Sequence, residues 1–332
     1  MNKQNLAISI LVVCLLCLVL GIFTPVKNKE ENIKAKNSAV FSNINNVSGD
    51  RIALLNIEGV ISADVEPASF WNTTFNTYYF IESLDKAAKD NKVKAILIRI
   101  NSPGGTVAAS QDIYDAVLRA REIKPIVVSM ADVCASGGYY VASAADRIVA
   151  QKGTMTGSIG VIFNFMDIAD LANKVGINSN VIKSGQFKDS GSMYRKITPA
   201  EKALFNSTVN MAYGQFINAI KSGRINRPKD LDKVAKRDLT EKTLKTYADG
   251  RVFLGEEAYK LGFVDSLGSM YEAKLLAEKL ANKPNLPLAS YNKMSGFKSM
   301  LMNMENKFNM PVKEMLPFSY LHSSQPLMIW EQ

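Results

Sequence analysis

Histidine is almost absent from this sequence of 332 residues, in which His322, ten residues from the C-terminus, is the sole example. A catalytic serine most often passes its proton to a histidine, so a serine nucleophile in this chain needs another base. A lysine serves as that base when burial lowers its pKa, because desolvation disfavours the charged amine. The shortage of histidine therefore argues against the commonest serine-hydrolase arrangement and leaves a serine-lysine pair open.

Cysteine and clustered positive charge are also scarce. Cys14 and Cys17 lie in an apolar run and Cys134 stands alone far downstream, so a disulfide framework is excluded and we expect neither a metal site nor a cofactor. Basic residues outnumber acidic ones by 40 to 31, giving a net charge of +9, but they are scattered singly among acidic residues. We therefore expect no nucleic-acid partner.

One long hydrophobic run is present, at residues 6–23, after a short N-terminal segment of residues 1–5. Its 18 almost wholly apolar positions would form about 27 Å of helix, close to the thickness of a hydrocarbon core. No clear cleavage pattern follows it, so we predict a single transmembrane anchor rather than a cleaved signal, with a buried core helix as the alternative. More lysines follow the run than precede it, and this count alone would place the rest of the chain in the cytoplasm.

Beyond the anchor, residues 24–49 are rich in Asn, Lys, Ser and Glu without periodicity, which predicts a flexible tether. From residue 50 onward, patterns typical of strands and helices alternate, which predicts an α/β fold of repeated strand-helix units. The expected strands are 51–57, 93–100, 125–130, 147–150, 158–163 and 177–182, and the expected helices are 78–91, 107–121, 137–145, 168–175, 199–221, 239–247 and 270–280.

Two turns between an apolar strand and a helix contain residues suited to catalysis. In the first turn, Gly104 and Gly105 follow the expected strand at 93–100. Consecutive glycines let backbone N–H groups approach an oxyanion or a phosphate closely. In the second turn, Ser136 precedes Gly137 and Gly138, as a nucleophile precedes an N–H donor in an elbow turn. Each turn also has a simpler interpretation, the first as a tight connection and the second as a helix cap.

Five ordered motifs together resemble the signal peptide peptidase A group of membrane-bound Ser-Lys proteases, which are related in fold to the Clp protease proteolytic subunit and the crotonases. They are Arg-Ile-Asn-Ser-Pro-Gly-Gly at 99–105, Ala-Ser-Gly-Gly-Tyr-Tyr-Val-Ala-Ser at 135–143, Thr-Gly-Ser-Ile-Gly-Val at 156–161, Ile-Lys-Ser-Gly-Gln-Phe-Lys-Asp at 182–189, and Asp-Gly-Arg-Val-Phe at 249–253. The resemblance spans about residues 50–285, the expected protease domain. The remaining tail, 286–332, has apolar residues at helical spacing near its middle, which favours an amphipathic helix for packing or membrane contact.

The resemblance implies a role for each matched residue. Ser136 corresponds to the nucleophile, Lys188 to the general base, and Ser158 to the residue that orients the lysine amine. The N–H groups of Gly105 and Gly137 correspond to the oxyanion donors. Cys134 competes as a nucleophile, but it precedes the turn by two residues, and we interpret it as a small buried core residue.

The resemblance further implies a membrane-anchored endopeptidase that degrades released signal peptides and similar apolar peptides. It implies that the catalytic domain lies on the extracytoplasmic face of a bacterial-type membrane, whereas the lysine count alone would place it in the cytoplasm. It also implies a homo-oligomeric ring whose sites are completed between protomers. Three alternatives remain open: a protease of the same fold specific for a membrane protein, a crotonase-like acyl-CoA enzyme, and a non-catalytic membrane scaffold.

Overall fold

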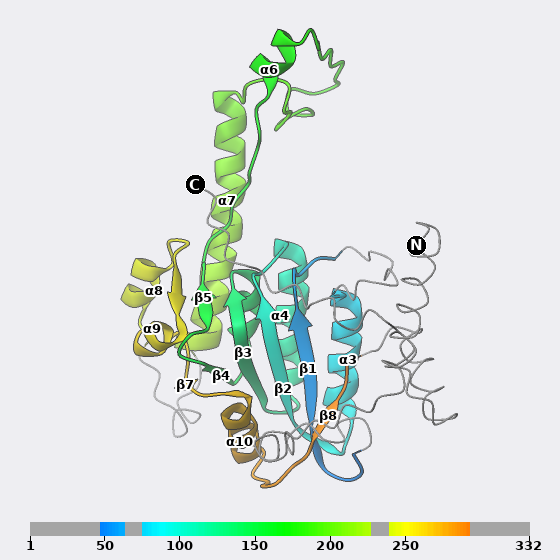
Figure 1. Cartoon of the computed structure of the whole chain (residues 1–332), viewed down its shortest axis with the longest axis vertical. Coiled ribbons are helices and arrows are strands. Elements are labelled where there is room, and N and C mark those ends of the chain that lie inside the picture. Colours follow the sequence, from blue (N-terminus) through cyan, green and yellow to red (C-terminus); the bar gives the residue numbers. More distant parts are fainter. Residues whose placement is uncertain (1–46, 64–74, 227–238, 293–332) are drawn as a thin grey trace, which may run out of the picture. The chain divides into compact units, whose positions relative to one another are not determined.

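The structure is a computed structural model, which describes residues 47–63, 75–226 and 239–292 (Figure 1). The expected anchor at 6–23, most of the tether and the expected amphipathic helix of the tail lie outside these ranges. Within them, every helix is too short or too polar to cross a bilayer.

One sheet of eight strands organises the described residues. Its main path runs β6-β5-β3-β2-β1-β8, while β4 lies beside β3 and β7 beside β4. All pairs are parallel except β5 with β6. The strands are β1 (Arg51–Glu58), β2 (Val93–Ser102), β3 (Ile126–Ala135), β4 (Arg147–Ala150), β5 (Met155–Gly157), β6 (Val252–Leu254), β7 (Ser266–Leu267) and β8 (Leu288–Ser290).

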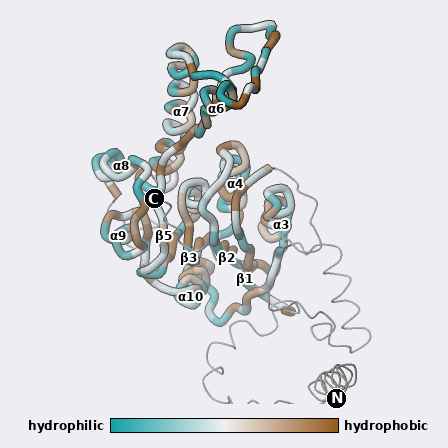
Figure 2. The backbone as a smooth tube through the Cα atoms, turned by 45° about the horizontal axis from the view of Figure 1, so that its top comes forward, coloured by the Kyte–Doolittle hydropathy of each residue, from teal (hydrophilic) through white to brown (hydrophobic). Residues whose placement is uncertain are grey.

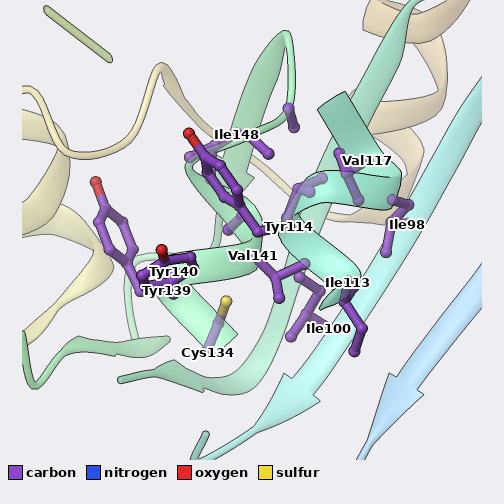
Figure 3. Packing of buried hydrophobic residues seen from close by; sticks show 14 of the residues in the cluster. Ile98, Ile100, Ile113, Tyr114, Val117, Cys134, Tyr139, Tyr140, Val141 and Ile148 are labelled. Atoms are coloured by element: carbon purple, nitrogen blue, oxygen red, sulfur yellow. The ribbon is translucent and has the colours of Figure 1, made fainter. Parts of the chain in front are cut away.

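Helices cover both faces of the sheet, so its central strands are largely buried and contain apolar runs at residues 95–98 and 126–128. The helices α3 (Thr77–Lys89), α4 (Val107–Arg121) and α5 (Gly137–Ala142) form one layer, and α10 (Met270–Leu280) contacts β2 and β3. Ile98 and Ile100 of β2 pack with Ile113 and Val117 of α4 in the main core cluster (Figure 3). The carboxyl ends of β2 and β3, which lead into the two glycine turns, are therefore fixed by a packed core.

A long excursion separates β5 from the next large helix. Residues 160–198 contain a single helix, α6 (Ala169–Lys174), and lead into α7 (Pro199–Ile220), which continues into the π-helical turn Lys221–Ile225. α7 begins with a capping box between Thr198 and Glu201, and buries Phe216, Ala219 and Ile220 near its other end. Figure 1 shows α7 extending away from the sheet, with α6 beside its N-terminal end. We call residues 160–198 the arm.

The remaining helices, α8 (Glu241–Tyr247) and α9 (Gly255–Lys260), lie near β5 and β6. The α/β architecture predicted from the sequence is confirmed, but two predicted strands are wrong. Residues 158–163 and 177–182 form no strand. Ile159 is buried, but Ile162 and Ile182 face solvent. The structure also contains α9, β7 and β8, for which no segment was predicted.

Candidate active site

Ser136 occupies the sharp turn between β3 and α5. Its backbone has φ 51° and ψ −120°, a region that residues with a Cβ rarely adopt. The turn is held on both sides, since Ser136 N–H donates to the Gly157 carbonyl at 2.9 Å and Tyr140 N–H donates to the Ser136 carbonyl at 2.9 Å. Such backbone costs about 1–3 kcal/mol and persists only where the surroundings fix it, a feature typical of a nucleophile elbow.

The glycine loop after β2 lies directly against this turn. A Cβ on Gly104 would lie 2.6 Å from the Gly137 nitrogen and 2.9 Å from the Ser136 Cβ. A Cβ on Gly137 would lie 3.2 Å from the Gly105 nitrogen. The two amide groups predicted as oxyanion donors are thus brought together beside the Ser136 side chain.

In the part of the chain that the structure describes, neither of these amides donates a backbone hydrogen bond outside the regular helices and strands. The bridge between Ile61 and Gly105 uses the N–H groups of Ile61 and Thr106, which donate to Gly104 at 2.9 Å and to Ile61 at 2.8 Å. Gly137 is the first residue of α5, a position whose N–H has no acceptor within the helix. The Gly105 and Gly137 N–H groups are therefore suited to bind developing negative charge.

Close packing around Gly105 leads to a prediction about its replacement. A Cβ there would lie 1.8 Å from the Ile61 carbonyl oxygen, so Gly105→Ala must displace backbone. We expect Gly105→Ala to lower the rate of peptide hydrolysis by about 100- to 1,000-fold, as loss of one oxyanion donor does, and to lower the free energy of unfolding by about 1–3 kcal/mol. Gly153→Ala is the matched control, because a Cβ at Gly153 meets no atom within 4 Å. Activity and thermal melting of both variants test this, and a fully active Gly105→Ala enzyme would contradict it.

Ser158 lies at the same edge of the sheet as Ser136. The parallel register pairs Ala135 of β3 with Gly157 of β5, so each serine is the residue that follows the last pair. Ser158 also has positive φ, 49°, and its N–H donates to the Arg251 carbonyl at 2.7 Å. The structure therefore brings Ser158, Ser136 and the two glycine amides together.

Lys188 does not lie beside Ser136 and Ser158. It is exposed and lies in the arm between α6 and α7, and within the described residues no hydrogen bond or ion pair joins it to Ser136 or Ser158. The arm also exposes several large apolar side chains, namely Ile162, Met166, Leu171, Val175, Ile177 and Ile182. Figure 2 shows hydrophobic stretches alternating with hydrophilic ones along the backbone near α6. Within the described residues, the site around Ser136 therefore lacks the lysine of the predicted pair.

An ion-pair network fixes the loop that carries Lys188. Arg195 donates to Asp189 at 2.8 and 2.9 Å and to Glu201 at 2.9 Å, and Lys183 donates to Asp189 at 2.6 Å. Hydrogen bonds from Arg195, and then from Lys183, hold the pKa of the Asp189 carboxyl well below its usual range. Arg195 and the cap residue Thr198 do the same for the pKa of Glu201. The network joins the Lys188 loop to the start of α7.

Cys134 is buried, as the sequence analysis interpreted it. Its side chain points into the core near Tyr139 and Val141 (Figure 3), and it pairs with Ser102 in the sheet. Complete burial raises the pKa of the Cys134 thiol, so the reactive thiolate is disfavoured. Within the described residues, no group of three or more His, Cys, Asp or Glu side chains is arranged to hold a metal ion.

Three side chains that no sequence motif singled out support β3, the strand that leads to Ser136. Arg99, Asn101 and Thr154 hydrogen-bond the backbone of β3 a few residues before Ser136. Arg99 and Asn101 lie inside a motif that was noted, but their side-chain partners depend on strand register. Thr154 carries no local signal, because its acceptor belongs to a strand 23 residues earlier in the chain.

Comparison with known proteins gives matches over most of the described chain. The family model described as Peptidase family S49 matches residues 119–283. A putative protease of Synechocystis is 35% identical over 257 residues, covering 74% of this chain and 87% of its own length. A putative signal peptide peptidase SppA of Enterococcus faecium is 29% identical, covering 90% of this chain and 88% of its own length. Among solved structures, the 1510-N membrane-bound stomatin-specific protease aligns with a TM-score of 0.43 at 16% identity, covering 74% of this chain and 98% of its own.

Proposed function

The chain belongs to peptidase family S49, and from this premise we propose that it is a membrane-anchored serine endopeptidase with a Ser136-Lys188 dyad that degrades released signal peptides and similar apolar peptides. A serine peptidase acts on peptide bonds, so family membership argues against both the acyl-CoA enzyme and the non-catalytic scaffold. The observation that carries the assignment of the nucleophile is the strained Ser136 turn, which lies against the Gly104-Gly105 loop.

Each site residue has a defined part in the proposed reaction. The neutral amine of Lys188 removes the proton from the Ser136 hydroxyl, and the serine oxygen attacks the peptide carbonyl. The Gly105 and Gly137 N–H groups donate to the oxyanion as it forms. The protonated lysine then gives its proton to the leaving amine, and water releases the acyl group by the reverse sequence. The Ser158 hydroxyl orients the lysine amine.

We propose that Lys188 acts on the Ser136 of a neighbouring protomer in a homo-oligomeric ring. Two observations support this: Lys188 is exposed in the arm, and the arm exposes apolar side chains such as Ile182, which is fully accessible. A segment that exposes many large apolar side chains is a candidate for a protein-protein contact. A subunit interface would also exclude water from the lysine, as a neutral amine requires.

The substrate proposal rests on the expected anchor and on the relatives. The apolar run at 6–23 would tether the enzyme to a bacterial-type membrane, with the catalytic domain on the extracytoplasmic face. An enzyme held there encounters the apolar peptides that remain after signal-peptide cleavage. A relative in Enterococcus faecium carries the name putative signal peptide peptidase SppA, which agrees with this substrate class.

Two synthetic peptides of equal length and net charge would test the substrate class. One contains a continuous apolar segment, and in the other serine or asparagine replaces every second apolar residue. With the full chain in detergent micelles, we expect kcat/KM for the apolar peptide to be at least about tenfold higher, because even one methylene group in an apolar pocket contributes about 10- to 200-fold. Equal rates would refute the substrate class, and exclusive cleavage of a membrane-protein segment would favour the membrane-protein-specific alternative.

A further inference from the structure

The strand that leads to Ser136, β3, contains a β-bulge, where its register with β2 shifts. Between the pairs Ile100 with Met130 and Ser102 with Cys134, β2 contributes the single residue Asn101, whereas β3 contributes residues 131–133. Extra residues in one strand leave backbone N–H and C=O groups without ladder partners and redirect the strand. The bulge therefore determines where the end of β3 points.

The bulge also marks the place where β3 changes neighbours. Before it, β3 pairs with β4 as far as Ser129 with Val149. After it, β3 pairs with β5, beginning at Val133 with Met155. The redirected strand end therefore runs beside the strand that leads to Ser158.

Three side chains bond the backbone groups of this bulge. Arg99 Nη1 donates to the Met130 carbonyl at 2.9 Å, and Thr154 Oγ1 donates to the Ala131 carbonyl at 2.7 Å. Asn101 Oδ1, which also comes from β2, accepts from the Val133 N–H at 3.1 Å. The donors and the acceptor come from β2 and from the turn before β5, so they hold the bulge from both neighbouring strands. We call Arg99, Asn101 and Thr154 the bulge bracket.

We propose that the bulge bracket positions Ser136 for catalysis, with Thr154 and Asn101 as positioning residues. The proposal rests on the proposed function, because it takes Ser136 as the nucleophile. Ser136 lies only three positions after Val133 in the sequence, and residues in a strand rise by about 3.3 Å each, so a relaxed bulge shifts the serine appreciably. A displacement of about 1 Å at a reacting group reduces the rate about 100-fold.

Thr154 acts through the strand and not on the substrate. Its side chain is 1% exposed, and its hydroxyl is used entirely within the fold, since it also accepts from Gln151 N–H at 3.1 Å. Loss of this hydroxyl therefore changes the placement of Ser136 without changing the surface that a peptide meets. The expected signature is a fall in kcat with little change in KM.

Thr154→Val in the full chain tests the proposal, because it removes the hydroxyl and keeps the side-chain shape. We expect kcat for an apolar peptide to fall about 10- to 100-fold, with KM within about twofold of the wild type. The rate at which a fluorophosphonate probe labels Ser136 should fall in parallel. Thr154→Ser keeps the hydroxyl and should retain most activity. Asn101→Leu should behave like Thr154→Val, and Asn101→Asp, which keeps an acceptor oxygen, should recover part of the loss.

Two controls separate positioning from general destabilisation and from failure of the proposed function. Ile96→Val weakens the far end of the same strand pair and should leave kcat unchanged in folded protein. Ser136→Ala should abolish both hydrolysis and labelling, and if it does not, the proposed function fails. Normal kcat and labelling in folded Thr154→Val, with only the melting temperature lowered, would overturn the positioning role. If Thr154→Val does not fold, the comparison of Asn101→Leu with Asn101→Asp decides in the same way.

Discussion

Peptide hydrolysis should fall by at least about 10⁴-fold when Ser136 is replaced by alanine, because the covalent step loses its nucleophile. The fold should survive, since Ser136 is only half-buried and its turn is held by backbone hydrogen bonds that alanine retains. Initial rates on an apolar peptide, together with thermal melting of the same preparation, measure both effects. This is the largest single effect that we expect.

Two control variants separate Ser136 from the other candidate nucleophile and base. Cys134→Ala should keep most activity, because the buried thiol lies in the core. His322→Ala should remain fully active, since the proposed base is a lysine. Full activity in Ser136→Ala would refute the assignment of the nucleophile. A dead but folded Cys134→Ala or His322→Ala enzyme would point to a thiol or histidine mechanism instead.

The parts of the fold that were predicted correctly are those with strong local signals. The helices at 107–121 and 270–280 have the predicted bounds, and Ser269 and Glu272 form a capping box at the start of the second. The strand at 147–150 also has the predicted bounds, and all four of its residues are buried, including Arg147. In these segments local preference and tertiary packing favour the same structure.

The two wrong predictions are the strands at 158–163 and 177–182, which contain apolar residues but do not join the described sheet. Residues 158–163 carry the apolar pattern of a strand, but β5 ends at Gly157 and Ser158 turns away with positive φ. Ile162 and Phe163 are then exposed on the arm. An apolar pattern indicates that side chains favour burial. It does not indicate whether they pack against the sheet, against another helix or against another subunit.

The candidate site likewise contains residues that have a local sequence signal and residues that have none. Ser136 and the glycine turns are local features, and the sequence alone suggested their chemistry. Lys188 is one lysine among many, and only the resemblance to a protease family singled it out. The bulge bracket was missed because register decides which backbone groups lack partners, and a change of register by one residue would give Thr154 a different acceptor.

Mixing two inactive variants should restore activity if each site is shared between protomers. Lys188→Ala protein retains Ser136, and Ser136→Ala protein retains Lys188, so a neighbouring pair in the correct order forms one complete site. In rings assembled at random from equal amounts, about a quarter of the interfaces have that order, and we expect about a quarter of wild-type activity. The measurement is the rate of peptide hydrolysis after dissociation and reassembly, with mixed composition verified by mass.

A second mixture provides the matched control. When wild-type protein is mixed equally with a variant that carries both Ser136→Ala and Lys188→Ala, shared sites leave about a quarter of the activity, because both neighbours at an interface must be wild type. Sites contained within one protomer leave about half. Inactive mixtures of the two single variants, with half the activity in this control, would place both residues in one protomer. In that case the exposed arm would have to fold back onto its own sheet, and the ring would control only the access of peptides to the site.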